Sequence, residues 1–399
     1  MSLSTHLIRR GIEAAHHGMV AAAGSSDQPA GGETPRISPL AAMIFVFSSL
    51  AFIVLLFSVG YTYGHLLPIL CMVESPETEA YVPVGTIDPT DPPAYTATPA
   101  PKPTDRQPDD LEDDTGGDAE VLLVRNKPFT ASIRQTILHL RARAGYWSKF
   151  RGLSMFLVWN VTAGILISIL ANIFPNRLGL ALAAIVAETA LATFNMAWVH
   201  IAISEPSEKR WYKRIPSLRT WPKIAPAVAL WATAHQAVSV LPMLVCGSFG
   251  SLKHMNDPDY EPGRKDLYAV GAQGVLGFSL MVALYVLLQI PATVTVVRVA
   301  ASMLPEEDET IVPFDRTFGG KTTPAIIGGQ GKIGLVEAWR SFPWESRMRL
   351  LRLMAKVTLI FLACWLLFTI VLVVESHILF GDKLGEMMKA VHGIARSHQ

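Results

Sequence analysis

The chain has 399 residues, of which 50% are hydrophobic and only 17% are charged. Soluble domains usually carry about 25% charged residues, so much of this protein's surface is expected to face something other than water. The formal net charge is +1, which provides no overall field for attracting nucleic acid. Composition therefore indicates an integral membrane protein, with the lipid bilayer as its main surrounding and no nucleic-acid partner.

Apolar segments long enough to cross a bilayer occur along the whole chain. A helix needs about 20 apolar residues to span the hydrocarbon core. Six segments meet this length, at 41–61 with a ragged extension to 73, and at 153–174, 178–203, 224–246, 267–294 and 356–380. We predict an all-α polytopic membrane protein with six transmembrane helices, a flexible N-terminal tail at 1–40 and a C-terminal tail at 381–399.

Basic residues are concentrated in every second connection. The odd-numbered connections contain Arg134, Arg141, Arg143, Lys149 and Arg151, then Lys209, Arg210, Lys213, Arg214, Arg219 and Lys223, and finally Arg316, Lys321, Lys332, Arg340, Arg347, Arg349 and Arg352. The second connection offers only Arg177, and the fourth offers Lys253, Arg264 and Lys265. Lysine and arginine accumulate in cytosolic loops. The odd connections are therefore predicted to be cytosolic, with both termini in the lumen or outside.

Two cytosolic connections differ in character. Residues 74–130 are rich in Pro, Thr and Asp. Such a composition buries too little apolar surface to offset its ordering entropy, so we predict a disordered loop that serves as a spacer or a partner-binding tether. Residues 304–355 mix turn and apolar residues and are predicted to be an ordered loop. Either loop is a candidate surface for cytosolic protein partners. Residues 131–303 hold the second to fifth spans with short loops.

The ordered loop ends in a basic amphipathic pattern. In the sequence FPWESRMRLLRLM, the side chains of Trp344, Met348 and Leu351 share one helical face, and the arginines lie elsewhere. This pattern predicts a short helix lying at the membrane surface before the sixth span.

No motif in the sequence carries a reaction. The three cysteines are Cys71, Cys246 and Cys364, and none forms a CxxC pair. This spacing is typical of small apolar fillers rather than of a metal site. Before Lys321, Asp315 occupies the position where a phosphate-binding loop needs glycine. His254 and Asp259 match a two-residue acyltransferase spacing without any companion motif. We therefore predict no catalytic, cofactor-binding or metal-ligating residue, and we do not expect an enzyme.

Polar side chains within the spans form the one candidate site. Glu188 and His235 lie about midway along the third and fourth apolar segments, and Asn160 and Asn195 lie at matching depths nearer the cytosolic side. Ionisable groups at mid-bilayer are costly and usually mark function or a buried pair. These four residues form either a proton- or solute-handling site, in which Glu188 and His235 exchange a proton, or a hydrogen-bonded cluster that fixes helix packing.

Three stretches of the chain carry a resemblance to a known family. They are VESPET at 73–78, ISEPSEKRWYKRIP at 203–216 and LPEEDETIVPFDRTFGG at 304–320. Together with the helix spacing, they resemble uncharacterised multi-pass membrane proteins of filamentous fungi, some of which are labelled ubiquitin carrier protein. Ubiquitin-conjugating enzymes need a soluble α/β domain with a catalytic cysteine, and the residues here do not support that label. The resemblance implies an ordered cytosolic face and brings no catalytic residues.

The sequence leaves two functions open. The leading hypothesis is a non-enzymatic scaffold or regulatory protein of the endomembrane system or plasma membrane. The alternative is a proton-coupled small-solute transporter or channel that uses the intramembrane Glu188–His235 site. A mitochondrial location is less favoured, because Glu13 interrupts the basic N-terminal stretch.

Overall fold

The computed structural model describes residues 39–75, 80–83, 121–124, 128–173, 176–249, 263–322, 329 and 331–381. Five helices are long and apolar enough to cross a membrane, and two helices that meet at a 60° bend pass the same test together, which makes six candidate spans if the pair is counted as one. This confirms the predicted all-α polytopic architecture. Both predicted tails lie almost wholly outside the described residues.

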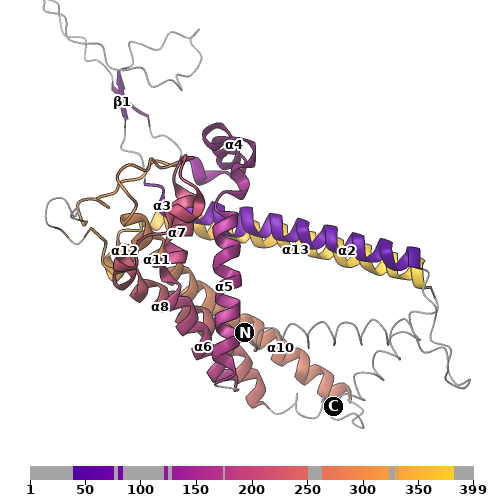
Figure 1. The fold of residues 1–399 in the computed structure, drawn as a ribbon. Coiled ribbons are helices and arrows are strands. Elements are labelled where there is room, and N and C mark those ends of the chain that lie inside the picture. The colour runs from indigo at the N-terminus through magenta and orange to yellow at the C-terminus, as the bar shows by residue number, and fades with distance from the viewer. Residues whose placement is uncertain are drawn as a thin grey trace, which may run out of the picture. The chain divides into compact units, whose positions relative to one another are not determined.

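The chain divides into two compact units (Figure 1). The first unit comprises Met1–Leu56 and Leu362–Gln399. Within it, the start of α2 (Pro39–Val59) lies along the end of α13 (Trp344–Phe380). The rings of Phe52 and Phe368 stack with centroids 3.8 Å apart, and the Ser48 hydroxyl donates to Glu375 Oε2 at 2.6 Å. The second unit, Phe57–Phe361, contains the helix bundle and the charged connections.

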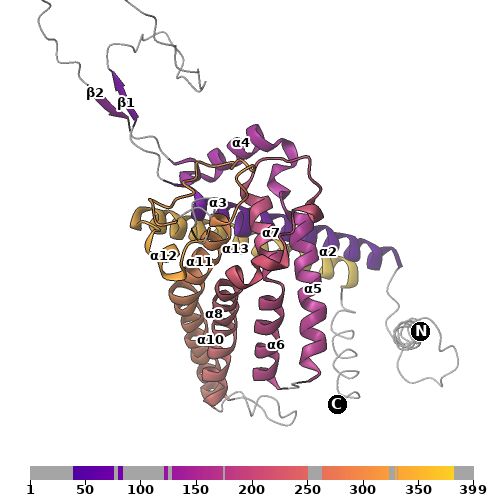
Figure 2. The same ribbon diagram turned by 60° about the vertical axis from the view of Figure 1, so that its left-hand side comes forward.

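The second unit is a bundle arranged around one central helix (Figure 2). Its α-helices are α3 (Leu67–Val73), α4 (Ile133–Ala144), α5 (Leu153–Ala171), α6 (Arg177–Ala190), α7 (Ala192–Ile203), α8 (Trp221–Ser248), α10 (Arg264–Leu284), α11 (Ile290–Ser302) and α12 (Leu335–Arg340). Helix α8 packs against α6, α7, α10 and α11. The bundle's remaining turns are the 3₁₀ segments Phe129–Ala131, Tyr146–Phe150, Trp211–Arg214 and Leu218–Thr220 and the π-helical segments η1 (Gly60–Leu66) and η7 (Tyr285–Gln289).

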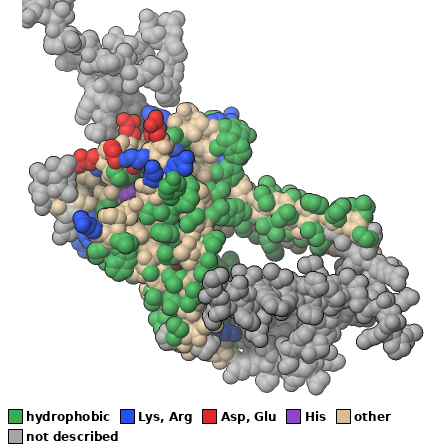
Figure 3. All heavy atoms as spheres, in the orientation of Figure 1, with side chains coloured by type: hydrophobic (Ala, Val, Ile, Leu, Met, Phe, Trp, Pro, Cys, Tyr) green, Lys and Arg blue, Asp and Glu red, His purple; other side chains and the backbone are tan. Residues whose placement is uncertain are grey.

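The outer faces of the bundle are apolar. On α5 the exposed side chains Leu157, Val161, Ile165 and Ile169 follow one another at intervals of four residues, which places them on one helical face. Helix α6 likewise exposes Leu178, Leu182 and Val186. Figure 3 shows hydrophobic side chains along these helices and charged ones gathered near α4. Such faces are expected to contact lipid, because exposing so much contiguous apolar surface to water is unfavourable.

The third span is broken where the sequence predicted one helix. Asn176 caps α6 by accepting from the Gly179 N–H at 2.5 Å, but the helix ends at Ala190 and α7 departs at 60°. The break at Leu191 contains neither Pro nor Gly. Instead, the Trp221 indole N–H on α8 donates to the Thr189 carbonyl at 3.0 Å, supplying a partner for a carbonyl at the bend. A kink of this kind is stabilised by a side chain inserted into the helix ladder.

The charged end of the second unit is an ordered cap, formed by the described residues of 74–75, 128–150, 203–220 and 304–342. It joins the three stretches that carry the family resemblance. Ser75 N–H donates to the Pro313 carbonyl at 2.9 Å, and the Ser75 hydroxyl accepts from Asp315 N–H at 2.8 Å. Glu205 N–H donates to the Glu309 carbonyl at 2.8 Å. Segments distant in sequence thus form one surface, as the prediction of an ordered loop at 304–355 requires.

The loop predicted to be disordered contains regular structure at its ends. Strand β1 (Ala80–Pro83) pairs antiparallel with β2 (Val121–Val124), with Ala80 opposite Val124. The apolar run VLLV at 121–124 has the β-propensity that the Pro- and Asp-rich stretch lacks. Residues 84–120 lie outside the described part, so the disorder prediction stays a prediction there.

The predicted interfacial helix is not separate. Residues 344–380 form one continuous helix, α13, so the basic stretch extends the sixth span. The face that packs against the bundle carries Ser346, Leu350 and Leu353, whereas Trp344 is exposed. Two of the three arginines that suggested a surface helix, Arg347 and Arg349, have partners in the cap. Arg347 stacks over the Trp339 ring at 4.0 Å and donates to the Phe342 carbonyl at 2.9 Å.

Candidate functional site

A cavity of about 410 Å³ lies within the second unit, and side chains from all six candidate spans line it. Its volume falls within the range of small-molecule sites, about 300–1,000 Å³. Segment η1 and helices α5, α6, α7, α8, α11 and α13 all contribute, so the cavity lies where the spans converge.

The four residues predicted from the sequence all line this cavity. Glu188 is half-buried on α6, and Asn195 is buried on α7. Asn160 on α5 and His235 on α8 are exposed, which places them at the rim. Matching depth in the predicted spans was therefore sufficient to bring these side chains round one space.

The polar groups of the cavity are not joined into one cluster. The Trp159 indole N–H donates to Glu188 Oε2 at 3.0 Å. Asn160 donates back to the Phe156 carbonyl of its own helix at 2.8 Å. The His235 ring stacks on Trp231, with centroids 5.8 Å apart and planes inclined by 12°. Among the described residues, no hydrogen bond or ion pair joins Glu188 to His235, so a direct proton exchange between them has no contact to support it here.

Two buried amide oxygens in the cavity wall lack a protein partner. Asn195 is 2% exposed and Gln289 is 6% exposed. Within the described part of the chain, neither Asn195 Oδ1 nor Gln289 Oε1 accepts a hydrogen bond. An unsatisfied buried polar atom costs about 1–3 kcal/mol. Both atoms belong to residues that line the same cavity, but each is itself buried behind its surface, so a bound molecule reaches them only when the wall shifts.

Irregular helix segments surround the cavity. The π-helical segment η1 contributes Gly64 and His65, and η7 contributes Tyr285 and Gln289. The break at Leu191 separates Glu188 from Asn195 on the third span. π-Helical segments are rare in proteins overall, but those that occur are often found at functional sites. Interrupted spans are typical of transporter substrate sites.

The inner wall is largely aromatic. Ring centroids of Trp159 and Trp198 lie 5.5 Å apart, and those of Trp159 and Trp231 lie 5.9 Å apart. The Phe156 and Trp198 rings lie 5.2 Å apart, and the imidazole of His65 is 5.0 Å from Phe156. These rings form a continuous wall beside the Glu188 carboxyl group.

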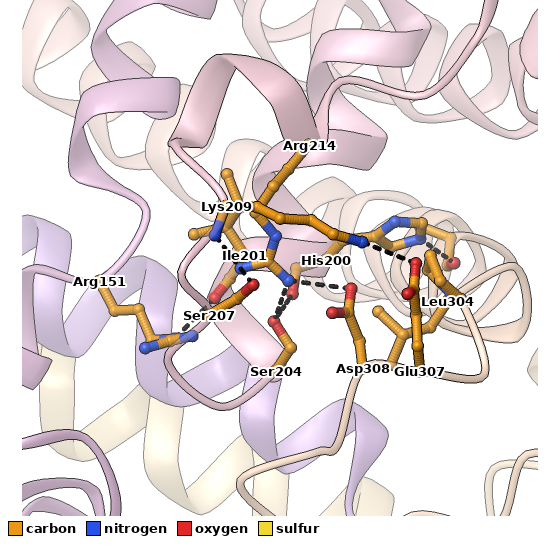
Figure 4. A network of polar contacts seen from close by, with 12 residues as sticks. Arg151, His200, Ile201, Ser204, Ser207, Lys209, Arg214, Leu304, Glu307 and Asp308 are labelled. Carbon is orange, nitrogen blue, oxygen red and sulfur yellow. Dashed lines mark hydrogen bonds and ion pairs between the residues drawn. The ribbon is translucent and has the colours of Figure 1, made fainter.

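A polar cluster at the boundary between the cap and helices α7 and α11 differs from the cavity in its contacts (Figure 4). Arg214 donates to Asp308 Oδ2 at 3.0 Å and to the Ser204 hydroxyl at 2.7 Å. The His200 imidazole bonds the Ala300 carbonyl at 2.8 Å, and Arg151 donates to the Ile201 carbonyl at 2.7 Å. Figure 4 shows these side chains directed at one another rather than into a space. The geometry of this polar cluster fits a structural role.

Desolvation and hydrogen bonding act against each other on one acidic group of the cap. Partial burial raises the pKa of Asp315, but the Thr317 hydroxyl and the backbone N–H groups of Gly319 and Thr317 outweigh it, so its pKa lies below the usual value. The charged carboxylate thereby fixes the turn at 315–320. This turn replaces the phosphate-binding loop that the glycines superficially suggest.

Sequence reasoning missed several lining residues. Gln289 is an amide in an otherwise apolar run, and this alone was a usable signal. His65 and Gly64 lie in the polar stretch GYTYGHL, at the ragged end of the first apolar segment. The tryptophans gave no signal of their own, because aromatic residues in a span more often serve packing.

Comparison with family models, curated proteins and solved structures finds no match for this chain. Its own fold and geometry define the class, which is a polytopic α-helical integral membrane protein with an internal polar cavity. Across the described residues, no group of three or more His, Cys, Asp and Glu side chains could hold a metal ion.

Proposed function

We propose that the protein binds a small solute in the cavity and carries it across the membrane, with Glu188 as the proton-linked group. The observation that supports this most strongly is the pair of unpartnered amide oxygens, Asn195 Oδ1 and Gln289 Oε1, buried in two residues that line one cavity. A cluster that only fixed helix packing would pair its buried polar groups.

The connection between the cavity wall and the cap supports alternating access. Met72 lines the cavity, and its carbonyl accepts from Arg298 Nη1 at 3.0 Å. Arg298 also donates to the Ser341 hydroxyl at 2.9 Å, which links the cavity wall to the cap. In contrast, His65, Asn160 and His235 are exposed at the rim. Transport requires that the cavity open to each side of the membrane in turn, and the irregular segments η1 and η7 are suitable hinges because they depart from the α-helical ladder.

Flux measurements in proteoliposomes test the proposal. Purified full-length protein is reconstituted with an internal pH-sensitive dye and exposed to amines, amino acids, carboxylates and sugars. We expect a proton-linked signal with at least one class. Glu188→Gln is expected to reduce it about tenfold or more, because hydrogen bonds to a charged group contribute about 1.5–3 kcal/mol.

Glu375→Gln is the matched control, since Glu375 lies in a candidate span but outside the cavity and bonds Ser48. It is expected to transport like the unaltered protein. Unchanged flux in Glu188→Gln, or no signal from any class above that of empty liposomes, would contradict the proposal.

The ordered cap favours a second candidate, a scaffold for cytosolic proteins that bind the cap or the loop at 74–130. Its supporting observation is the union of three distant stretches into one surface. This function does not need the cavity. Partner capture that survives Glu188→Gln, without any flux, would favour it.

A further inference from the structure

The lining of the cavity holds one acidic side chain. Among its described lining residues, Glu188 is the only Asp, Glu, Lys or Arg side chain, and His65, His235 and Tyr285 are the other titratable groups. Arg298, which bonds the Met72 carbonyl of the wall, is held in the cap by Ser341 and lies over the Phe318 and Phe342 rings at 4.6 and 5.5 Å. The polar field within the cavity therefore comes from one carboxyl group and from neutral dipoles.

The open acceptor of the cavity is the Glu188 carboxyl group. Asn195 Oδ1 and Gln289 Oε1 also lack a partner among the described residues, but both are buried behind the cavity surface. The Glu188 carboxyl receives one N–H, from Trp159, and its second oxygen accepts no hydrogen bond from the described residues. An ammonium group supplies up to three N–H donors and no acceptor, which matches the open carboxyl oxygen.

The aromatic wall suits the same charge. Trp159, Trp198 and Trp231 line the cavity together with Phe156. Faces of aromatic rings attract cations, tryptophan most strongly, and the attraction grows when water is excluded. The apolar remainder of the lining, which includes Ile69, accommodates a hydrocarbon body.

Resting on the proposed function, we infer that the solute is a hydrophobic organic amine, bound as its ammonium ion with the charged end between Glu188 and the tryptophan faces and the apolar body against the aliphatic part of the lining.

A matched set of three compounds tests the inference: 4-phenylbutylamine, 4-phenylbutan-1-ol and 4-phenylbutyrate, which differ only in the terminal group. Binding to the full-length protein in lipid nanodiscs is followed by quenching of tryptophan fluorescence. We expect the amine to bind about tenfold or more tightly than the alcohol, and the carboxylate to bind most weakly. Non-specific partition into lipid is controlled by the alcohol and by protein-free nanodiscs.

Two variants locate the binding. Glu188→Gln is expected to weaken amine binding about tenfold or more while changing alcohol binding little. Trp231→Leu removes an aromatic face without touching the carboxyl group, and is expected to weaken amine binding about threefold or more. It serves as the test if the Gln variant does not fold. Glu375→Gln is expected to bind the amine like the unaltered protein.

The failures of the two proposals are distinguishable. Equal binding of amine and alcohol, or tightest binding of the carboxylate, overturns the amine inference but leaves a solute site in the cavity. The inference is also overturned if both Glu188→Gln and Trp231→Leu bind the amine as tightly as the unaltered protein does. If no compound binds and no solute class gives flux, both the inference and the proposed function fall.

Discussion

Replacing Glu74 by alanine is expected to lower the free energy of unfolding by about 3–5 kcal/mol, the usual effect of breaking a buried ion pair from one side. Glu74 is 3% exposed at the end of α3. Its carboxylate accepts from the Phe129 N–H at 2.6 Å, from the Thr130 N–H at 3.2 Å and from the Thr130 hydroxyl, and it lies 3.5 Å from Arg349. Alanine would leave these donors buried without a partner.

The effect is measured as a shift of the thermal unfolding midpoint in detergent, expected to be on the order of 10 °C. Glu205→Ala is the matched control. It removes the carboxylate of an exposed pair with Arg143, at 2.9 Å, and is expected to cost about 1 kcal/mol or less. If Glu74→Ala melts like the control, Glu74 does not hold the turn at Phe129–Ala131 to the end of the first span.

Replacing Arg298 by alanine is expected to cost about 2–4 kcal/mol, because each buried acceptor left unpaired costs about 1–3 kcal/mol. Arg298 is 6% exposed, and its guanidinium serves the Met72 carbonyl at 3.0 Å and both Ser341 oxygens, at 2.9 and 3.3 Å. The Phe318 ring above it belongs to a residue with φ of 52°. Such a left-handed conformation is costly for phenylalanine, and the contact with Arg298 helps to maintain it.

Arg298→Lys separates charge from geometry. Lysine keeps the cation but lacks the planar fork that reaches two acceptors and stacks on rings, so it is expected to recover only part of the loss. Arg352→Ala, an exposed arginine of α13, is the control and should leave the melting temperature nearly unchanged. If Arg298→Lys melts like the unaltered protein, the bidentate role of Arg298 is contradicted. If Arg298→Ala lowers the melting temperature no more than Arg352→Ala does, Arg298 is not a structural link.

The spans were predictable because hydropathy and charge alternation report directly on the bilayer. Depth along those spans also placed Glu188, His235, Asn160 and Asn195 round one space. The breaks were predictable only in part. The π-helical segment at 285–289 ends just before Pro291, which lacks the N–H that the helix ladder needs. The kink at Leu191 has neither glycine nor proline, and the Trp221 indole that bonds the Thr189 carbonyl there comes from another helix, a tertiary contact with no local signature in sequence.

The basic stretch before the sixth span was misread for a related reason. Its arginines resemble those of a surface helix when only the sequence is considered. In the structure, Arg347 and Arg349 find partners in the cap, and the face with Ser346 and Leu350 is buried. A long side chain near a membrane interface can bury its stem and pair its head, so a run of charges alone does not determine which face packs.

Modification of a cysteine within the cavity decides whether a solute can enter it from water. Thr293→Cys places a thiol in the cavity wall on α11, and Val299→Cys places one on the same helix where it is 1% exposed and does not line the cavity. Both are made after Cys71, Cys246 and Cys364 are replaced by alanine, and both are treated with a methanethiosulfonate carrying a trimethylammonium group. We predict rapid modification of Thr293→Cys, slowed by 4-phenylbutylamine, and none of Val299→Cys. Modification of the two thiols at the same low rate would contradict the proposal that the cavity is a solute site.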